Sequence, residues 1–300
     1  MTSPQLLFVH ALSPLHAGTG QSIGAIDLAI ARDRATQFPY LPGSSLKGCL
    51  RDVAGLKFLK GTESDKDLIK KLFGPDTTNA SEQAGSLIVS DANLLLLPVR
   101  SVAGTFAWVT SPYLLHRFFR DVKAAGLSIE PPPVPADVSA CVIGKSSSLV
   151  AHVDKTKKVI FEDLDFNPNE ESSLDKFASW LGMQIFEDSF FQANLAQRLC
   201  IVHDDVMTFL SEHATDVVAR IALEDDTKTV KQGALWYEES LPTESILVGL
   251  VCAQPVKQAE MKPEDVMKRA SELMMLSIQL GGKATVGRGR CQLRLSGGRS

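Results

Sequence analysis

An isolated carboxylate is the first feature of the sequence that could do chemistry. Asp27 stands in the stretch GAIDLAIARD, among glycine and aliphatic residues. One carboxylate cannot enclose Mg²⁺ or Mn²⁺, which favour octahedral oxygen ligation, but it can supply one ligand where phosphate oxygens and water supply the others. Asp27 could therefore contribute one ligand to a divalent metal if a bound anion supplied the others. From the residues alone, a loop aspartate that bonds its own turn is the commoner alternative.

Three further residues are weaker candidates for the same chemistry. His16 lies in the glycine-rich stretch PLHAGTG and could serve as a general acid or base, although a structural, hydrogen-bonded histidine explains it as well. Tyr237 and Glu238 lie between Trp236 and Glu239 near the end of an expected hairpin. If the chain binds nucleic acid, an aromatic of this group could stack on a base, and a glutamate could assist the aspartate of a neighbouring subunit. Strand alternation offers the plainer alternative of two buried and two exposed residues.

Two segments have the composition of phosphate-binding surfaces. The stretch LPGSSLKGCLR predicts the start of a helix, where free backbone N–H groups favour anions, with Lys47 and Arg51 four residues apart. Near the C-terminus, GGKATVGRGR combines glycines that permit close backbone approach with three cations. The candidate nucleic-acid contacts are Ser44, Ser45, Lys47, Arg51, Gly281, Gly282, Lys283, Arg288 and Arg290. An ordinary capped helix and a helix end followed by a bulged turn are the alternatives.

The charge distribution supports a local anion-binding surface. The chain has 300 residues and a net charge of −4, yet residues 28–60 carry a net charge of +4 and residues 281–300 carry +5, so the rest carries −13. An acidic body with two basic segments is typical of a protein that binds an anionic partner at one place.

The elements that must position these residues follow an irregular order. Strands are expected in QLLFVHALS, SLIVSDANLLLLPV, TFAWVT, SILVGLVCAQP and RCQLRLSG, and a helix at residues 43–60, with Ser44 or Ser45 as its cap and with Leu46, Leu50, Val53 and Leu56 as its buried stripe. Further helices are expected from Pro112, at 173–183, at 188–198 and from Pro263 to the glycines at 281–282. The acidic stretch 162–175 is expected to be a loop. Residues of about 61–86 are expected to form a polar insertion around a short helix at 65–73. A long hairpin is expected over about 216–242. This mixture predicts one elaborated α+β domain over residues 1–300, with a ferredoxin-like arrangement as the leading option.

Three signatures in order resemble those of the RAMP superfamily of CRISPR proteins: LPGSSLKGCLR, then LFGPDTTNASEQAGSLIVSDA, then GGKATVGRGR. The segment IGAIDLAIARD and the hairpin ending GALWYEESLP narrow the resemblance to backbone subunits of the Cmr, or type III-B, effector complexes.

This resemblance implies a ferredoxin-like, RRM-related palm with insertions and an extended thumb hairpin. It also implies a subunit that polymerises along a guide RNA beside other Cmr-complex subunits, and whose thumb kinks the guide–target duplex. Each copy would cleave single-stranded target RNA paired to the guide, with Asp27 at the cleavage site and a divalent metal. With the target 2′-hydroxyl as nucleophile, the products would end in a 2′,3′-cyclic phosphate.

Rival functions stay open at this level. The chain could be a guide-binding backbone without cleavage, a metal-independent nuclease that matures the guide through His16, or a small-molecule enzyme of ferredoxin-like fold. Five cysteines without CxxC spacing disfavour zinc and disulfides and favour a reducing, cytoplasmic location. The first residues show neither the basic region nor the long apolar stretch of a signal peptide. No apolar run reaches the roughly 18 residues of a membrane span, so no membrane association is expected.

Overall fold

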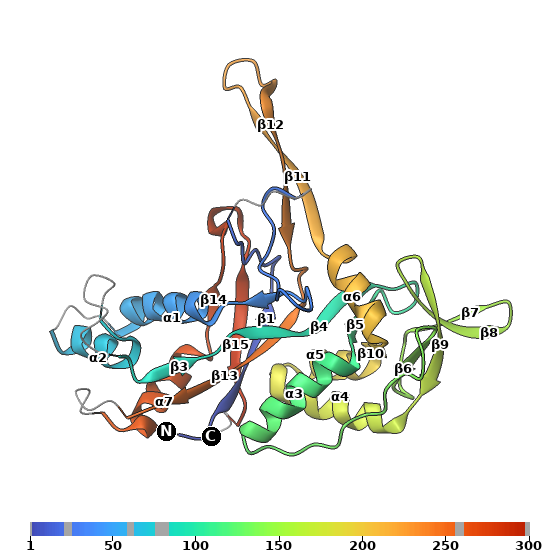
Figure 1. The fold of residues 1–300 in the computed structure, drawn as a ribbon, viewed down its shortest axis with the longest axis horizontal. Coiled ribbons are helices and arrows are strands. Elements are labelled where there is room, and N and C mark those ends of the chain that lie inside the picture. Colours follow the sequence, from blue (N-terminus) through green and yellow to red (C-terminus); the bar gives the residue numbers. More distant parts are fainter. Residues whose placement is uncertain (1, 21–25, 59–62, 76–83, 256–260, 298–300) are drawn as a thin grey trace.

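The computed structural model describes residues 2–20, 26–58, 63–75, 84–255 and 261–297. Most of its strands join one large mixed sheet, which separates two groups of helices, and a two-stranded hairpin projects from the body (Figure 1). The α+β class expected from the sequence is confirmed. Among the described residues, no helix is both long and apolar enough to cross a membrane.

The sheet can be followed strand by strand. Its order is β14-β15-β1-β13-β4-β5-β10-β6-β9-β8-β7, with β2 attached to β4 and β3 attached to β13. Neighbours are antiparallel except for the parallel pairs β5–β10 and β6–β9. The strands are β1 Gln5–Ala11, β2 Tyr40–Leu41, β3 Leu87–Val89, β4 Ala92–Arg100, β5 Phe106–Thr110, β6 Ala140–Ile143, β7 Val150–Val153, β8 Thr156–Phe161, β9 Leu164–Glu170, β10 Leu199–Val202, β13 Ile246–Ala253, β14 Ser277–Gln279 and β15 Arg290–Leu295.

Helices cover both faces of this sheet because its central strands are apolar on both sides. On β1, Leu7 and Val9 face one hydrophobic cluster, whereas Leu6 and Phe8 face the other. The first cluster holds α1 Gly43–Phe58, α2 Glu63–Phe73 and α7 Pro263–Leu273, and α6 Asp204–His213 contributes to it as well. The second cluster holds α3 Pro112–Ala124, α4 Ser172–Ile185 and α5 Ser189–Arg198.

The long hairpin expected near 216–242 is present as β11 Asp216–Leu223 and β12 Val230–Ser240. It forms a separate two-stranded sheet, and its base meets the body beside the connection between β14 and β15 (Figure 1). The helix expected at 65–73 is present as α2, while residues 76–83 of the expected insertion lie outside the described residues.

Several local expectations were wrong. The expected helix from Pro263 to residues 281–282 ends at Leu273, because the following apolar residues build β14, where Ile278 pairs with Cys291. The acidic stretch 162–175 is not a loop, since β9 runs through it and buries Phe166. On α1, Leu56 is 88% exposed and Ala54 takes its place in the buried stripe. In each case tertiary packing overrode the local pattern.

Candidate functional site

Asp27 lies on the surface against the base of the hairpin. Its carboxylate Oδ2 accepts a hydrogen bond of 2.8 Å from the backbone N–H of Tyr237, and no protein donor is recorded for Oδ1 among the described residues. The next residue, Leu28, bonds the backbone of Tyr237 and Glu239 and forms a parallel bridge with β12. Asp27 is therefore attached to the hairpin rather than to the large sheet.

Glu238 follows Tyr237 on β12 and is paired with two cations. Its side chain is 5% exposed, and Oε1 accepts bonds of 2.7 Å from Lys283 and 2.8 Å from Trp236, while Arg220 lies 3.4 Å from Oε2. Burial alone would raise the pKa of Glu238. The bonds from Lys283 and Trp236 and the two positive charges outweigh burial and lower the pKa from 4.5 to about 2. Glu238 thus stays ionised and holds the hairpin to the glycine-rich loop, which favours a supporting role over acid–base chemistry.

His16 is also more enclosed than its glycine-rich surroundings suggested. Its side chain is buried, and Nδ1 lies 2.6 Å from the carbonyl oxygen of Glu239. A carbonyl only accepts, so Nδ1 carries the hydrogen and Nε2 faces Gly18, where a Cβ would lie 2.6 Å away. The His16 carbonyl in turn accepts a bond of 2.9 Å from the Gly282 N–H. This placement favours the structural alternative for His16.

The glycine-rich stretch 280–289 connects two strands, β14 and β15, and does not follow a helix as expected. A Cβ on Gly281 would collide with the His16 carbonyl, and one on Gly289 would collide with the Leu280 carbonyl, so both positions require glycine. Both also have positive φ, +70° and +76°. The turn thereby folds down onto the loop that carries His16.

The cations of this loop have different surroundings. Lys283 is bonded to Glu238, and Arg288 is buried, with its guanidinium donating a bond of 2.6 Å to the Ser240 hydroxyl. Arg290 is exposed, as are Gly281 and Gly282. We therefore expect direct contacts with a ligand chiefly from Arg290 and the exposed backbone of the glycines, whereas Arg288 supports the hairpin base. Its buried guanidinium does not fit the expected direct contact.

The N-terminus of α1 has a protein partner that the sequence did not suggest. The Gly43 N–H donates a bond of 2.7 Å to Asp91, so neither Ser44 nor Ser45 caps the helix. Gly43 packs so tightly that a Cβ would lie 2.6 Å from the Val89 carbonyl. Both serines remain exposed in the first turn. Asp91 belongs to the residues SDA that end the second signature, and its place in that signature is the sequence feature that could have indicated this role.

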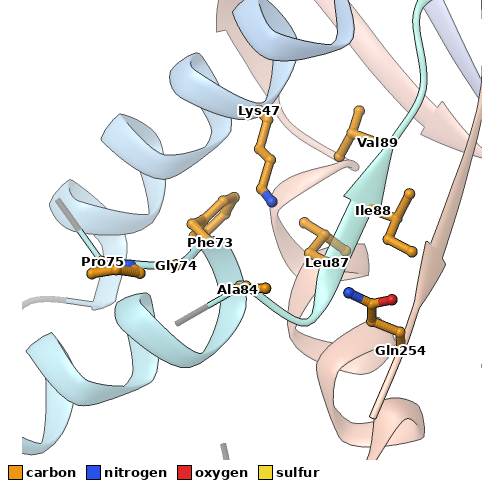
Figure 2. A pocket seen from close by; sticks show the side chains of 10 residues that line it. Lys47, Phe73, Gly74, Pro75, Ala84, Leu87, Ile88, Val89 and Gln254 are labelled. Carbon is orange, nitrogen blue, oxygen red and sulfur yellow. The ribbon is translucent and has the colours of Figure 1, made fainter. Parts of the chain in front are cut away.

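Lys47 and Arg51 both lie against the segment at the end of α2. Lys47 extends into a cavity of about 430 Å³ between α1 and β3, opposite Gln254 (Figure 2). Burial, with a smaller effect of Arg51, lowers the pKa of the Lys47 amine. Arg51 donates a bond of 2.9 Å to the Pro75 carbonyl. Their role as phosphate contacts stays a prediction.

The structure nevertheless brings the distant signatures together. The helix α1 packs against β14, the strand that leads into the glycine-rich turn. Gly282 bonds His16, and Lys283 bonds Glu238, whose neighbour Tyr237 holds Asp27. One surface therefore combines an exposed carboxylate, the glycine-rich turn and the neighbouring α1.

The residues present fit a divalent metal only in part. Among the described residues there is no group of three or more His, Cys, Asp or Glu that could hold a metal ion. Asp27 offers one carboxylate oxygen that has no recorded protein donor. An ion held here would take its remaining ligands from a bound anion and water, an arrangement common for Mg²⁺.

Comparison with known proteins identifies the family. The model of the RAMP superfamily matches residues 8–292. The chain is 34% identical to the CRISPR system Cmr endoribonuclease Cmr4 of Pyrococcus furiosus over 97% of this chain and 95% of that protein. The crystal structure of oligomeric Cmr4 from Pyrococcus furiosus superposes with a TM-score of 0.74 at 28% identity, covering 98% and 99% of the two chains.

The same fold recurs in a chain of the type III-B Cmr-beta complex bound to cognate target RNA, with a TM-score of 0.74 at 21% identity, covering 98% of this chain and 97% of that one. At that identity the likeness shows the fold. The family match and the relative both span nearly the whole chain, so this protein belongs to the RAMP superfamily of CRISPR proteins, among its Cmr4-like members.

Proposed function

We propose that this chain is the backbone subunit of a type III-B CRISPR ribonucleoprotein and that it cleaves single-stranded target RNA paired to the guide. The observation that carries the proposal is the exposed Asp27 carboxylate, held at the hairpin base beside the glycine-rich turn. The relative named as a Cmr endoribonuclease supports the activity. Base pairing with the guide, and not the protein, would select the target.

The guide backbone would lie along the exposed glycines of the turn 280–289 and the first turn of α1. Ser44, Ser45 and Arg290 are exposed there and can donate hydrogen bonds to phosphate oxygens. Such contacts depend on backbone shape and charge and not on base identity. That is what a protein carrying guides of any sequence requires.

Cleavage would use the target's own 2′-hydroxyl. That oxygen attacks the adjacent phosphorus, the 5′-oxygen of the next nucleotide leaves, and the products carry a 2′,3′-cyclic phosphate and a 5′-hydroxyl. Asp27 Oδ1 would accept the hydroxyl proton or hold the attacking group, while Oδ2 stays on the Tyr237 N–H. A divalent metal, Mg²⁺ or Mn²⁺, bound through Asp27 would supply positive charge to the phosphate.

The large sheet and the projecting hairpin would correspond to the palm and thumb of the family. The strand order β15-β1-β13-β4, antiparallel throughout, with α1 following β1 and α7 preceding β14 and β15, supports a ferredoxin-like palm. The projecting β11–β12 hairpin would be the thumb. We expect one elaborated domain, working in the cytoplasm, where its five free thiols would stay reduced.

The partners would be the guide RNA, the target RNA, further copies of this chain and other Cmr-complex subunits. The oligomeric crystal form of the Pyrococcus furiosus relative supports self-assembly.

The decisive experiment is target cleavage by the reconstituted complex carrying Asp27→Asn. We expect the cleavage rate to fall by at least about 100-fold while target binding changes less than about 3-fold, because the amide keeps the shape of the side chain but loses its charge. Wild-type cleavage by Asp27→Asn would overturn the assignment. A complex in which neither form cuts would indicate a non-cleaving backbone, and full cutting in EDTA would indicate the metal-independent alternative through His16.

A further inference from the structure

The buried carboxylate of Glu239 lies two residues after Tyr237, whose backbone N–H holds Asp27. Glu239 is 2% exposed, and its oxygens accept bonds from three separate places: the Ile30 N–H at 3.1 Å, the Thr215 hydroxyl at 3.0 Å, and the guanidinium of Arg32. The sequence did not indicate a partner for this glutamate. The partner is Arg32, five residues after Asp27 in the same segment.

Arg32 joins three parts of the molecule. Besides Glu239, its guanidinium donates bonds of 2.9 Å to the Ser211 carbonyl at the end of α6 and of 2.8 Å to the Gln37 carbonyl in its own turn. Its side chain is 15% exposed. The planar guanidinium, which has several donors in a fixed arrangement, suits this set of acceptors, whereas a lysine could not match their directions.

The geometry relates this ion pair to Asp27. The segment that carries Asp27 is attached to β12 at two places. Asp27 and Leu28 bond the strand's backbone around Tyr237, and Ile30 and Arg32 bond the side chain of Glu239, two residues further along the strand. The second attachment sets the direction in which the chain leaves Asp27.

We propose that Arg32 and Glu239 are positioning residues, whose ion pair holds the Asp27 carboxylate at the orientation needed for cleavage. The inference rests on the proposed function. Loss of the negative charge of Glu239 leaves the largely buried Arg32 cation without its ionic partner and weakens the attachment of the 30–32 segment, so Asp27 keeps its N–H bond to Tyr237 but loses its fixed approach. Displacement by about 1 Å is enough to lower a cleavage rate by roughly 100-fold.

The test uses the full chain assembled with guide RNA and its partner subunits. Glu239→Gln should lower the single-turnover cleavage rate by about 10- to 100-fold, leave the Kd for target RNA within about 3-fold, and raise several-fold the Mn²⁺ concentration giving half the maximal rate. Arg32→Lys keeps the charge and should show the same pattern to a smaller degree. The matched control is Glu170→Gln, which removes an ion pair of 2.6 Å with Lys157 on β8 and β9 and should change neither rate nor Kd.

The readouts separate positioning from general support. A rate within about 2-fold of wild type, or a rate and an affinity that fall in proportion, would overturn the inference. If Glu239→Gln does not assemble, Arg32→Lys and Thr215→Val carry the test by the same criteria. Asp27→Asn is measured alongside. If it cuts like wild type, Asp27 is not the cleavage residue and the proposed function fails. If Asp27→Asn is inactive and Glu239→Gln is fully active, only the positioning role is rejected.

Discussion

Replacement of Glu238 by glutamine tests the electrostatic link between the hairpin and the glycine-rich loop. The change keeps the size of the side chain and an oxygen acceptor for Lys283 and Trp236, but removes the negative charge. The pKa of Glu238, lowered from 4.5 to about 2, corresponds to at most about 3 kcal/mol of stability at neutral pH. Lys283 and Arg220 are 32% and 39% exposed, so screening by solvent reduces the expected loss to about 2 kcal/mol.

The pH dependence of that loss has a definite sign. A carboxylate whose pKa is lowered by folding stabilises the protein above its unfolded pKa, and this stabilisation disappears as the pH falls toward the folded pKa. The difference in unfolding free energy between wild type and Glu238→Gln should therefore be constant from pH 7 to about 5. It should shrink below pH 4.5 and approach zero near pH 2.

Urea unfolding at pH 7, 5 and 3.5 measures this difference. Glu170→Gln is the control, because its pair with Lys157 is exposed and should contribute no more than about 1 kcal/mol. A Glu238→Gln loss equal to that of the control at pH 7, or the same loss at pH 7 and 3.5, would refute the electrostatic argument.

Four further outcomes are expected. Asp91→Ala removes the cap of α1 and should lower the free energy of unfolding by about 0.5–2 kcal/mol, measured by urea titration. Gly289→Ala, at a positive φ with no room for a Cβ, should lower the melting temperature clearly, and an unchanged melting temperature would contradict the steric argument. Arg290→Ala should weaken guide binding and lower the salt dependence of the binding constant by about one charge, without loss of stability. Arg288→Ala should mainly lower stability. Binding titrations at several salt concentrations separate the two variants. EDTA should stop cleavage but not target binding, and added Mn²⁺ or Mg²⁺ should restore cleavage; cutting that persists in EDTA contradicts the metal requirement.

Local patterns in the sequence were reliable where one element carries its own signal. The α3 helix begins after Ser111 with Pro112 at its first position, and β1, β5, β13 and β15 follow their apolar runs. The hairpin at 216–242 was equally clear, because alternation over two long strands leaves few other solutions. The signature residues likewise pointed to the family, which the comparisons confirmed.

Contacts between distant segments decided what the candidate residues do. No residue near Gly43 in the sequence indicates that Asp91 caps its helix. Likewise, no residue near Lys283 or Arg288 indicates that they bond Glu238 and Ser240. The strand β14 was mistaken for helix because Ile278 gains its partner only from β15. Such pairings depend on burial and on desolvated charge, which a linear pattern does not record.

The sequence by itself indicated the family and the class of fold, and it singled out Asp27 as the residue on which the proposed chemistry depends. Only the tertiary structure decided which charges remain available for a ligand. Folding joins the base of the hairpin, the glycine-rich turn and the Asp27 segment. The carboxylates of Glu238 and Glu239 are buried there and need cationic partners. Lys283 and Arg32 satisfy them because an unpaired charge in that setting would cost more than the loss of two surface cations.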